Sequence, residues 1–221
     1  MVLYVSYNII FVYMKEKKLI AFDLFDTCLE LQQPNISYKQ LFSDLWIYDR
    51  KPELKEILLT SHRSMEDILA DFVPDAKIHY FVDIYNKNLH NEIHSAQLFP
   101  ETEFVLSALK NRWYMIAAIS NIGKPYTQVL YNLLPDVFNY EVLSCDIGAK
   151  KPDKKIFDVL KRVSWYSSDE MLMVWDHMIS DVQWAKNAGI DPIHIDRLSS
   201  WIIYHKDYIS ISALNQLLEI L

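Results

Sequence analysis

Residues 18–27 read KLIAFDLFDT, and this stretch decides how the rest of the chain is interpreted. Its first part, KLIAFD, is an apolar run that ends in the acid Asp23, which is typical of a buried strand followed by a turn. Asp26 and Thr27 follow within four positions of that acid. Ligands of parallel α/β sheets bind beyond the carboxyl ends of the strands, so this turn is a candidate site.

Two segments further along have the patterns expected around such a strand. Residues 113–119 (WYMIAAI) form a continuous apolar run, as a central parallel strand does. Residues 100–111 begin with proline and acids, which favours a helix. Its predicted buried face consists of Phe104, Val105, Ala108 and Leu109. A second helix is predicted from Pro152, with a buried face made of Ile156, Val159, Leu160 and Val163.

Strands and helices alternate through the remaining sequence. Further strands are predicted at 140–144, 170–175 and 192–195, and further helices at 125–134, in the stretch before Gly189, and at 209–221. This alternation predicts an α/β fold, a Rossmann-like parallel sheet sandwiched by helices.

The stretch 34–98 lacks a strand-like run and is predicted to be an inserted, all-helical cap domain. Ser37 with Gln40, and Ser64 with Asp67, have the spacing of helix starts. One helical face is expected to consist of Ile78, Phe81, Val82, Tyr85 and Leu89. The core domain would comprise residues 15–33 and 99–221. Residues 1–14 are interpreted as an N-terminal extension before a start at Met14, with an extra strand as the alternative.

Composition excludes several functional classes. The 221 residues carry a formal net charge of −7, whereas a nucleic-acid surface needs a basic stripe. Three glycines are too few for a Gly-rich phosphate or dinucleotide loop. The apolar segment 1–14 is too short to span a bilayer, so no membrane partner is expected. Cys28 and Cys145 suggest neither a disulfide framework nor a metal cluster, which makes a reducing cytoplasm the expected location.

Polar residues follow the predicted strands at their carboxyl ends. Because the carboxyl ends of parallel strands meet at one edge of a sheet, these residues are expected to converge. They are Asp23, Ser120, Asn121 and Asp176, with Asp181 five residues beyond Asp176 and Lys151 just before the helix from Pro152.

In this order the groups resemble the motifs of the haloacid-dehalogenase-like superfamily, over nearly the whole chain after Met14. The first family motif is a strand followed by Asp-x-Asp-x-Thr, which is matched by Asp23 and Thr27, with Phe25 at the second acid. The second is a Ser or Thr after a hydrophobic strand, which is matched by Ser120 in AAISN.

The third and fourth motifs are also present. The third is a Lys in a Lys-Pro-Asp context, matched by Lys151 in KKPDKKIF rather than by its neighbour Lys150. The fourth is a strand ending in Gly-Asp with a second Asp beyond it. Here it reads VWDHMISDVQWAKNAGI and contains Asp176 and Asp181.

The resemblance implies a magnesium-dependent hydrolase that acts on a small-molecule phosphate ester. Asp23 would be the nucleophile and would form an aspartyl-phosphate. Lys151 would offset the charge that gathers during phosphoryl transfer. Ser120 and the backbone N–H of Asn121 would hold phosphoryl oxygens, and Thr27 would order the turn after the nucleophile.

Magnesium takes oxygen ligands. The resemblance implies Asp23, the backbone carbonyl of Phe25 and Asp176 as protein ligands. Asp181 would anchor the metal shell through water or its neighbours, although a helix-capping role is an alternative.

Two residues depart from the family pattern. Phe25 stands where the family's phosphatases have the Asp that serves as general acid and base, and its ring cannot carry a proton. Asp26 stands where the family usually has Gly, and its side chain is expected to point elsewhere along an extended segment. Trp175 replaces the Gly before Asp176 and is expected to crowd the metal side.

These departures keep two other functions open. One is a non-catalytic or very slow member that keeps the fold for binding or regulation. The other is a metal-independent 2-haloacid dehalogenase, since those enzymes also carry an aromatic residue two positions after the nucleophile. Their fourth motif is built on Ser and Asn, so Asp176 favours magnesium and phosphate.

Overall fold

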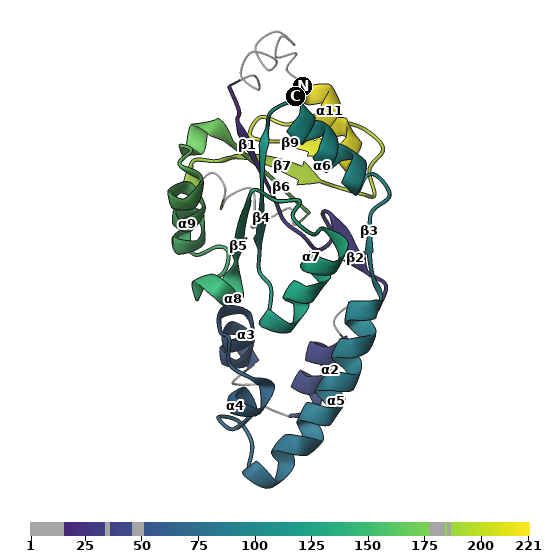
Figure 1. Cartoon of the computed structure of the whole chain (residues 1–221), viewed down its shortest axis with the longest axis vertical. Helices are drawn as coiled ribbons and strands as arrows, with labels where there is room; N and C mark the ends of the chain where they lie inside the picture. The colour runs from purple at the N-terminus through teal and green to yellow at the C-terminus, as the bar shows by residue number, and fades with distance from the viewer. Residues whose placement is uncertain (1–15, 34–35, 46–50, 177–183, 185–186) are drawn as a thin grey trace.

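The computed structural model describes residues 16–33, 36–45, 51–176, 184 and 187–221. Its centre is a seven-stranded sheet in the order β5-β4-β1-β6-β7-β9-β8 (Figure 1). All neighbouring strands run parallel except β8, which is antiparallel to β9 at one edge. The strands are β5 (Tyr140–Leu143), β4 (Met115–Ser120), β1 (Leu19–Phe22), β6 (Met171–Trp175), β7 (Asp191–Ile195), β9 (Ile209–Ile211) and β8 (Ile203–Tyr204). The predicted α/β fold with a Rossmann-like parallel sheet is confirmed.

Strand β1 lies inside the sheet, between β4 and β6, and is buried on both faces. Leu19 and Ala21 point into one hydrophobic cluster, and Ile20 and Phe22 point into the other. A parallel strand covered on both sides needs apolar residues at every position, because its side chains alternate between the faces. The uninterrupted apolar run of the sequence is therefore what allows this strand to occupy the middle of the sheet.

Helices cover the two faces of the sheet. Helix α9 (Lys154–Ser164) packs on one face through Ile156 and Phe157. Helix α6 (Thr102–Asn111) packs on the opposite face through Val105 and Leu109 (Figure 1). The remaining elements around the sheet are η2 (Lys124–Tyr126), α7 (Thr127–Leu133), α8 (Ser144–Ile147), η3 (Ser168–Glu170), η4 (Leu214–Gln216) and α11 (Leu217–Ile220).

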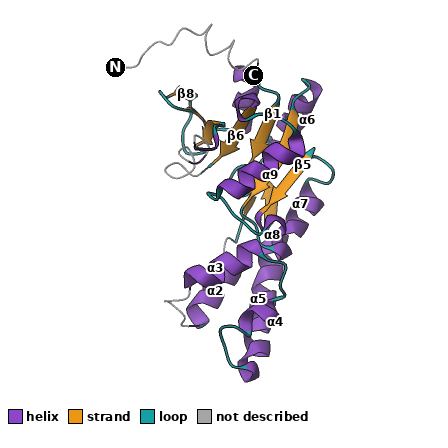
Figure 2. Cartoon of the chain, turned by 90° about the vertical axis from the view of Figure 1, so that its left-hand side faces the viewer, coloured by secondary structure: helices purple, strands orange, loops and turns teal. Residues whose placement is uncertain are grey.

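Between β1 and α6, the chain leaves the sheet and forms a group of helices, which we call the helical segment (residues 36–94). Its elements are α2 (Ile36–Asp44), α3 (Lys51–Thr60), α4 (Met65–Leu69) and α5 (Asp75–His94). They lie together beyond one end of the sheet (Figures 1 and 2). The predicted face of α5 is buried, with Ile78 at its partly buried margin. That these helices form a separate cap domain remains a prediction.

Four strands of the structure, β2, β3, β8 and β9, are absent from the sequence-based prediction. Strands β2 (Leu29–Leu31) and β3 (Ala96–Leu98) form an antiparallel ribbon at the base of the helical segment. The end of the predicted all-helical stretch is therefore strand.

The helix predicted over 209–221 is wrong, because β9 occupies its first part and only η4 and α11 follow. A three-residue segment such as Ile209–Ile211, which reads ISI, is too short for its periodicity to distinguish strand from helix.

Three smaller expectations also change. Phe104 is 66% exposed and Val163 is 41% exposed, because each lies at the margin of the buried helix face. Ser37 does not cap α2 through Gln40 in the described contacts, since its hydroxyl hydrogen-bonds the buried Glu92. Ser64 does cap α4, by accepting a hydrogen bond from the backbone N–H of Asp67.

Two expectations concern residues outside the described ranges. The N-terminal extension over residues 1–14 lies outside them, as does most of the helix predicted before Gly189. Among the residues that the structure describes, every helix falls short of the length or apolar character that a membrane-spanning helix needs.

The packing of α9 predicts how two phenylalanines differ. Phe157 is 1% exposed, so Phe157→Ala should lower the free energy of unfolding by about 3–5 kcal/mol. Phe104→Ala is the matched control, and its 66% exposure predicts a change within about 0.5 kcal/mol. Urea unfolding measures both values, and similar losses in the two variants would contradict the assigned core.

Candidate active site

The turn after β1 holds Asp23 at the carboxyl end of the central strand. Its backbone N–H donates to the carbonyl of Val174 at 2.9 Å, which continues the pairing with β6. The Asp23 Oδ1 atom accepts a hydrogen bond from the N–H of Leu24 at 2.8 Å. The turn closes on itself, because the N–H groups of Cys28 and Leu29 both donate to the Leu24 carbonyl. Asp23 is thus fixed at a strand end with its side chain 17% exposed.

Asp26 adopts a left-handed backbone conformation in this turn, with φ of 59°. The expectation of an extended segment is therefore wrong, since the chain reverses here and the Asp26 N–H donates to the Leu29 carbonyl at 2.7 Å. Glycine takes this conformation without strain, which explains why the family usually has Gly at this position. Burial and the nearby charges of Asp23 and Glu30 raise the pKa of the Asp26 carboxyl, although the charge of Arg197 opposes them.

Lys151 reaches Asp23 from the loop before α9. Its Nζ atom lies 2.6 Å from Asp23 Oδ2 and 3.1 Å from the carbonyl oxygen of Ile119. The Lys151 side chain is 3% exposed, so these partners replace the water that its ammonium group has lost. The neighbouring Lys150 instead pairs with Glu56 of the helical segment. The structure therefore brings Lys151 to Asp23, as the motif order predicts.

Asn121 holds the loop that carries Lys151. Its Oδ1 atom accepts from the Lys151 N–H at 2.6 Å, and its Nδ2 group donates to the Lys151 carbonyl at 2.9 Å. Ser120 lies beside it at the end of β4 and is 1% exposed. The motif suggested a role for the Asn121 backbone only, whereas in the structure the Asn121 side chain also binds the backbone of Lys151. No signal in the sequence links these two residues, which are 30 positions apart.

Asp176 follows β6 and lies at the same edge of the sheet as Asp23. Burial, together with the charges of Asp23 and Asp26, raises the pKa of Asp176 to about 6. Its backbone carbonyl accepts a hydrogen bond from His194 Nε2 at 2.9 Å, and His194 Nδ1 contacts Ser210 Oγ at 2.8 Å. His194 is 3% exposed and ties β7 and β9 to the Asp176 backbone, a role that its sequence context does not signal.

The Trp175 side chain is directed into the core next to the site. It is fully buried in the cluster beneath α9, together with Phe157 and Met173. The Lys151 Nζ atom lies 6.0 Å from the centre of its ring, within the range of a cation–π contact. The indole therefore lies beside Lys151, and its crowding of a bound metal stays a prediction.

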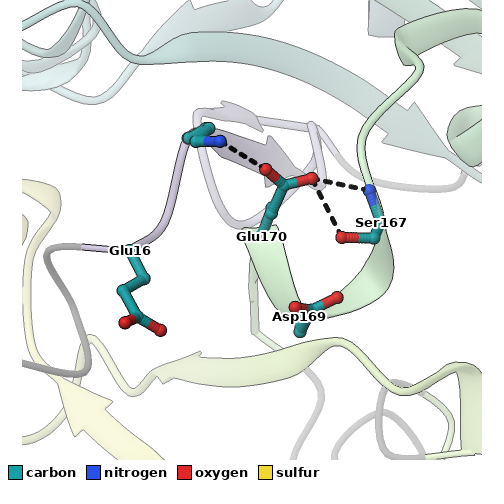
Figure 3. A pocket seen from close by; sticks show the side chains of 5 residues that line it. Glu16, Ser167, Asp169 and Glu170 are labelled. Carbon is teal, nitrogen blue, oxygen red and sulfur yellow. Dashed lines mark hydrogen bonds and ion pairs between the residues drawn. The ribbon is translucent and has the colours of Figure 1, made fainter.

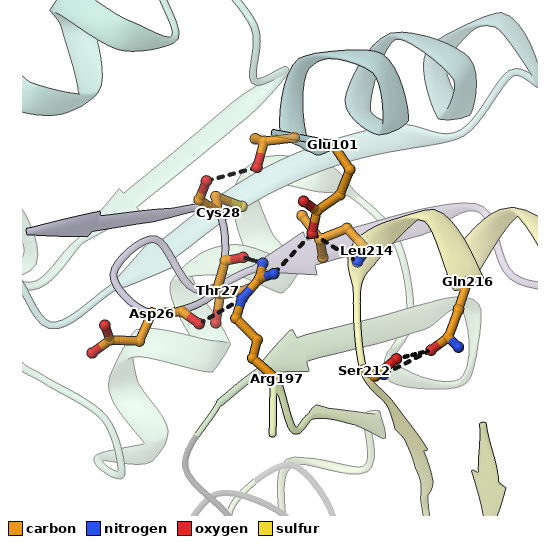
Figure 4. A network of polar contacts seen from close by, with 9 residues as sticks. Asp26, Thr27, Cys28, Glu101, Arg197, Ser212, Leu214 and Gln216 are labelled. Carbon is orange, nitrogen blue, oxygen red and sulfur yellow. Dashed lines mark hydrogen bonds and ion pairs between the residues drawn. The ribbon is translucent and has the colours of Figure 1, made fainter. Parts of the chain in front are cut away.

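Phe25 and Thr27 complete the turn. The Phe25 ring meets the ring of Tyr126 edge-on, with centroids 6.2 Å apart, so it faces the elements next to the helical segment. Thr27 is fully buried, and its Oγ1 atom finds no partner among the described residues. The Thr27 carbonyl accepts from Arg197, which also contacts Asp26 and Glu101 (Figure 4). Arg197 lies in no motif, so sequence reasoning missed it.

The oxygen donors at this edge suit a magnesium ion. Asp23 and Asp176 follow adjacent strands. Burial and then the charge of Asp23 raise the pKa of Asp176, and a cation would offset the two negative charges. These two carboxylates and the Phe25 carbonyl are the described residues that would hold the ion. Within the described ranges no group of three or more His, Cys, Asp or Glu side chains forms a metal cluster. Asp181 and His177 lie outside those ranges.

A hollow lies at the opposite edge of the sheet, away from this site. Glu16, Lys18, Ser167, Asp169 and Glu170 line it, and they precede β1 and β6 rather than follow them (Figure 3). Glu170 bonds Lys18, at 2.5 Å, and Ser167, so these three polar groups are already engaged with one another.

Comparisons with known proteins agree with this arrangement. The chain matches the family described as haloacid dehalogenase-like hydrolase over residues 20–195. A glyceraldehyde 3-phosphate phosphatase of Pyrococcus furiosus is 31% identical over 128 residues, which are 55% of this chain and 53% of that protein. A phosphoserine phosphatase of Thermus thermophilus is 29% identical over 103 residues, 45% of this chain and 41% of that protein. The chain thus matches about half the length of these curated relatives, or less.

A solved structure shares the fold over almost the whole chain. The 2-haloacid dehalogenase from Pseudomonas syringae pv. Tomato has a TM-score of 0.65 and 22% identity, covering 92% of this chain and 97% of that one. At this identity the similarity establishes the fold and carries no information on the reaction.

The two hydrogen bonds of Asn121 generate a stability prediction. Asn121→Ala leaves the backbone N–H and carbonyl of Lys151 without their partner, which should cost about 1–3 kcal/mol of unfolding free energy. Asn132→Ala on the exposed surface of α7 is the control, with an expected change within about 0.5 kcal/mol. Urea unfolding of both variants tests this, and equal stability would show that the bonds contribute nothing.

Proposed function

The chain belongs to the haloacid dehalogenase-like hydrolase family, and we propose that it is a magnesium-dependent phosphatase of a small phosphate ester. The observation that carries the proposal is the Asp23–Lys151 pair at the carboxyl end of β1, with Asp176 directly after the neighbouring strand β6. The names of the two curated relatives, which are phosphatases of small phosphorylated compounds, support the same chemistry.

In the proposed reaction the Asp23 carboxylate attacks the phosphorus, and the bond from phosphorus to the ester oxygen breaks, which releases an alkoxide or phenoxide that takes a proton from water. The product is an aspartyl-phosphate, which water then hydrolyses to regenerate Asp23 and release phosphate. Oδ1 of Asp23 is engaged by the Leu24 N–H, and Oδ2 by Lys151, so the carboxylate is oriented before substrate arrives. When bound, magnesium would add positive charge opposite the transferring phosphoryl group.

The other motif residues would bind the phosphoryl group. Lys151 would offset the negative charge on the phosphoryl oxygens, since the Lys151 ammonium group is held within the site by Asp23 and the Ile119 carbonyl. Ser120 and the backbone N–H of Asn121 would donate hydrogen bonds to the same oxygens. Thr27, buried within the turn, would order the segment after the nucleophile.

We also propose that the helical segment is a cap that contributes substrate contacts. It meets the core beside the site, since the Ser144 hydroxyl of α8 donates to the Leu59 carbonyl of α3 at 2.6 Å. Lys150, next to Lys151, pairs with Glu56 of α3. The unpaired, buried cysteines support the cytoplasm as the proposed location, because a reducing compartment keeps thiols free.

Phe25 gives the specific reason to keep a second candidate, a metal-independent 2-haloacid dehalogenase. A halide leaves without a proton, so that reaction does not need the acid that Phe25 replaces. Chelation separates the two reactions. Phosphatase activity should vanish with chelator and return with magnesium, whereas dehalogenation of 2-chloropropionate in the presence of chelator would favour the second candidate.

Replacing the nucleophile tests the covalent mechanism. Asp23→Asn is nearly isosteric, but its amide cannot attack phosphorus, so kcat should fall at least about 10³-fold while the fold stays intact. Asp83→Asn on the exposed side of α5 is the control and should keep full activity. Hydrolysis of p-nitrophenyl phosphate measures both. Substantial activity in a folded Asp23→Asn variant would exclude the aspartyl-phosphate route.

Phe25 predicts which esters react. A positioned acid–base group contributes about 10²–10⁴-fold in rate, so alkyl phosphates should be far slower than aryl phosphates, whose leaving groups depart unprotonated. Phe25→Asp should raise alkyl-ester hydrolysis more than aryl-ester hydrolysis.

Asp26→Ala tests the rival proton carrier in the same assays. A loss of about 10²-fold in Asp26→Ala, without a gain in Phe25→Asp, would assign the proton transfer to Asp26. Absence of turnover with every ester would favour a non-catalytic member of the family.

A further inference from the structure

The turn that carries Asp23 contains a conformation that its sequence disfavours. Asp26 has φ of 59°, in the region where a residue with a Cβ atom is strained. Its N–H bonds the Leu29 carbonyl, and the N–H groups of Cys28 and Leu29 bond the Leu24 carbonyl. These bonds stay within the turn. A contact from outside the turn would therefore help to hold Asp26 in this conformation.

Arg197, from the loop after β7, makes that contact. Its Nη2 atom donates to the Thr27 carbonyl at 2.5 Å, and its Nε atom donates to the Asp26 carbonyl at 3.4 Å. Figure 4 shows the guanidinium group beside the two carbonyls, with the Asp26 carboxylate turned away from it. One planar side chain thus engages two consecutive backbone carbonyls at the left-handed residue.

Glu101 fixes the orientation of Arg197. Its Oε1 atom accepts from the Nη1 atom of Arg197 at 2.8 Å and from the N–H of Leu214 at 3.2 Å (Figure 4). The guanidinium carbon also lies 3.3 Å from the centre of the Phe99 ring, a stacked cation–π arrangement. Burial alone would raise the pKa of Glu101, but hydrogen bonds from Arg197 and from backbone N–H groups lower it. The side chains of Arg197 and Glu101 are 22% and 19% exposed, so the pair is partly shielded from water.

We propose that Arg197, oriented by Glu101, is a positioning residue that holds the Asp23 turn in its reactive conformation. The proposal rests on the phosphatase function for its kinetic consequence. Asp23 and the Phe25 carbonyl both belong to the turn, whereas Ser120, Asn121 and Lys151 come from other elements. Loosening the turn should therefore lower kcat and leave KM nearly unchanged.

The test compares three arginine variants. Arg197→Ala removes the contacts, and Arg197→Lys keeps the charge but loses the planar fork. Arg112→Lys is the matched control, since Arg112 at the end of α6 also donates to a backbone carbonyl, that of Leu218 at 2.9 Å, away from the turn. With p-nitrophenyl phosphate and magnesium, kcat should fall about 10-fold to 10²-fold in both Arg197 variants, with KM within about threefold, while Arg112→Lys matches the parent protein.

Amide hydrogen exchange gives a readout that does not depend on activity. The N–H groups of Asp26, Cys28 and Leu29 should exchange at least about tenfold faster in the Arg197 variants, while those of β4 keep their protection. Unchanged exchange in the turn would overturn the proposal. If the parent protein hydrolyses no phosphate ester, the proposed function fails, and the exchange rates still decide whether Arg197 holds the turn.

A double-mutant cycle tests the connection to Asp26. Glycine takes the left-handed conformation without strain, so Asp26→Gly should make the turn less dependent on Arg197. Exchange in the turn should then rise less on Arg197→Lys in the Asp26→Gly background than in the parent. Comparing kcat within the Asp26→Gly background cancels any proton transfer by the Asp26 carboxylate. Equal effects of Arg197→Lys in the two backgrounds would show that Arg197 does not support the strained residue.

Discussion

The ion pair between Lys151 and Asp23 is the interaction on which the geometry of this molecule's candidate site depends. The Lys151 side chain is 3% exposed, and burying an ammonium group is costly unless counter-charges and carbonyls replace the water it has lost. Asp23 and the Ile119 carbonyl fill that role, and Asn121 fixes the Lys151 backbone through two hydrogen bonds. The ends of β1 and β4 and the loop before α9 are thereby tied together around one buried charge.

The order of the strands brings the remaining groups to this pair. Strands β4 and β6 flank β1, so Ser120 and Asp176 end up on either side of Asp23 at one edge of the sheet. Burial and the negative charge of Asp23 raise the pKa of Asp176, and the charge of Lys151 opposes this only in part. Such an arrangement is unfavourable for stability alone, but it is suited to bind a cation and a phosphoryl group.

Residues outside the motifs hold the motif residues in place. His194 contacts the Asp176 backbone from β7, and Arg197 contacts the turn of Asp23 from the loop that follows the same strand. On the other side, the Phe25 ring packs against Tyr126, whose hydroxyl bonds the buried Glu92 of the helical segment. The residue that departs most from the family pattern therefore faces the helices that we propose as the cap.

The sequence alone determined the alternation of strands and helices, and with it the parallel sheet, because a strand buried on both faces leaves an uninterrupted apolar run such as LIAF. It also indicated Asp23, Ser120, Lys151 and Asp176 as one group, since motif order follows strand order. It did not indicate β9 or the contacts of Asn121, His194 and Arg197. A three-residue strand has too few positions to show a period, and these side chains act on partners distant in sequence. Only the tertiary structure brings such residues into contact, because a hydrogen bond to a remote backbone group leaves no local pattern.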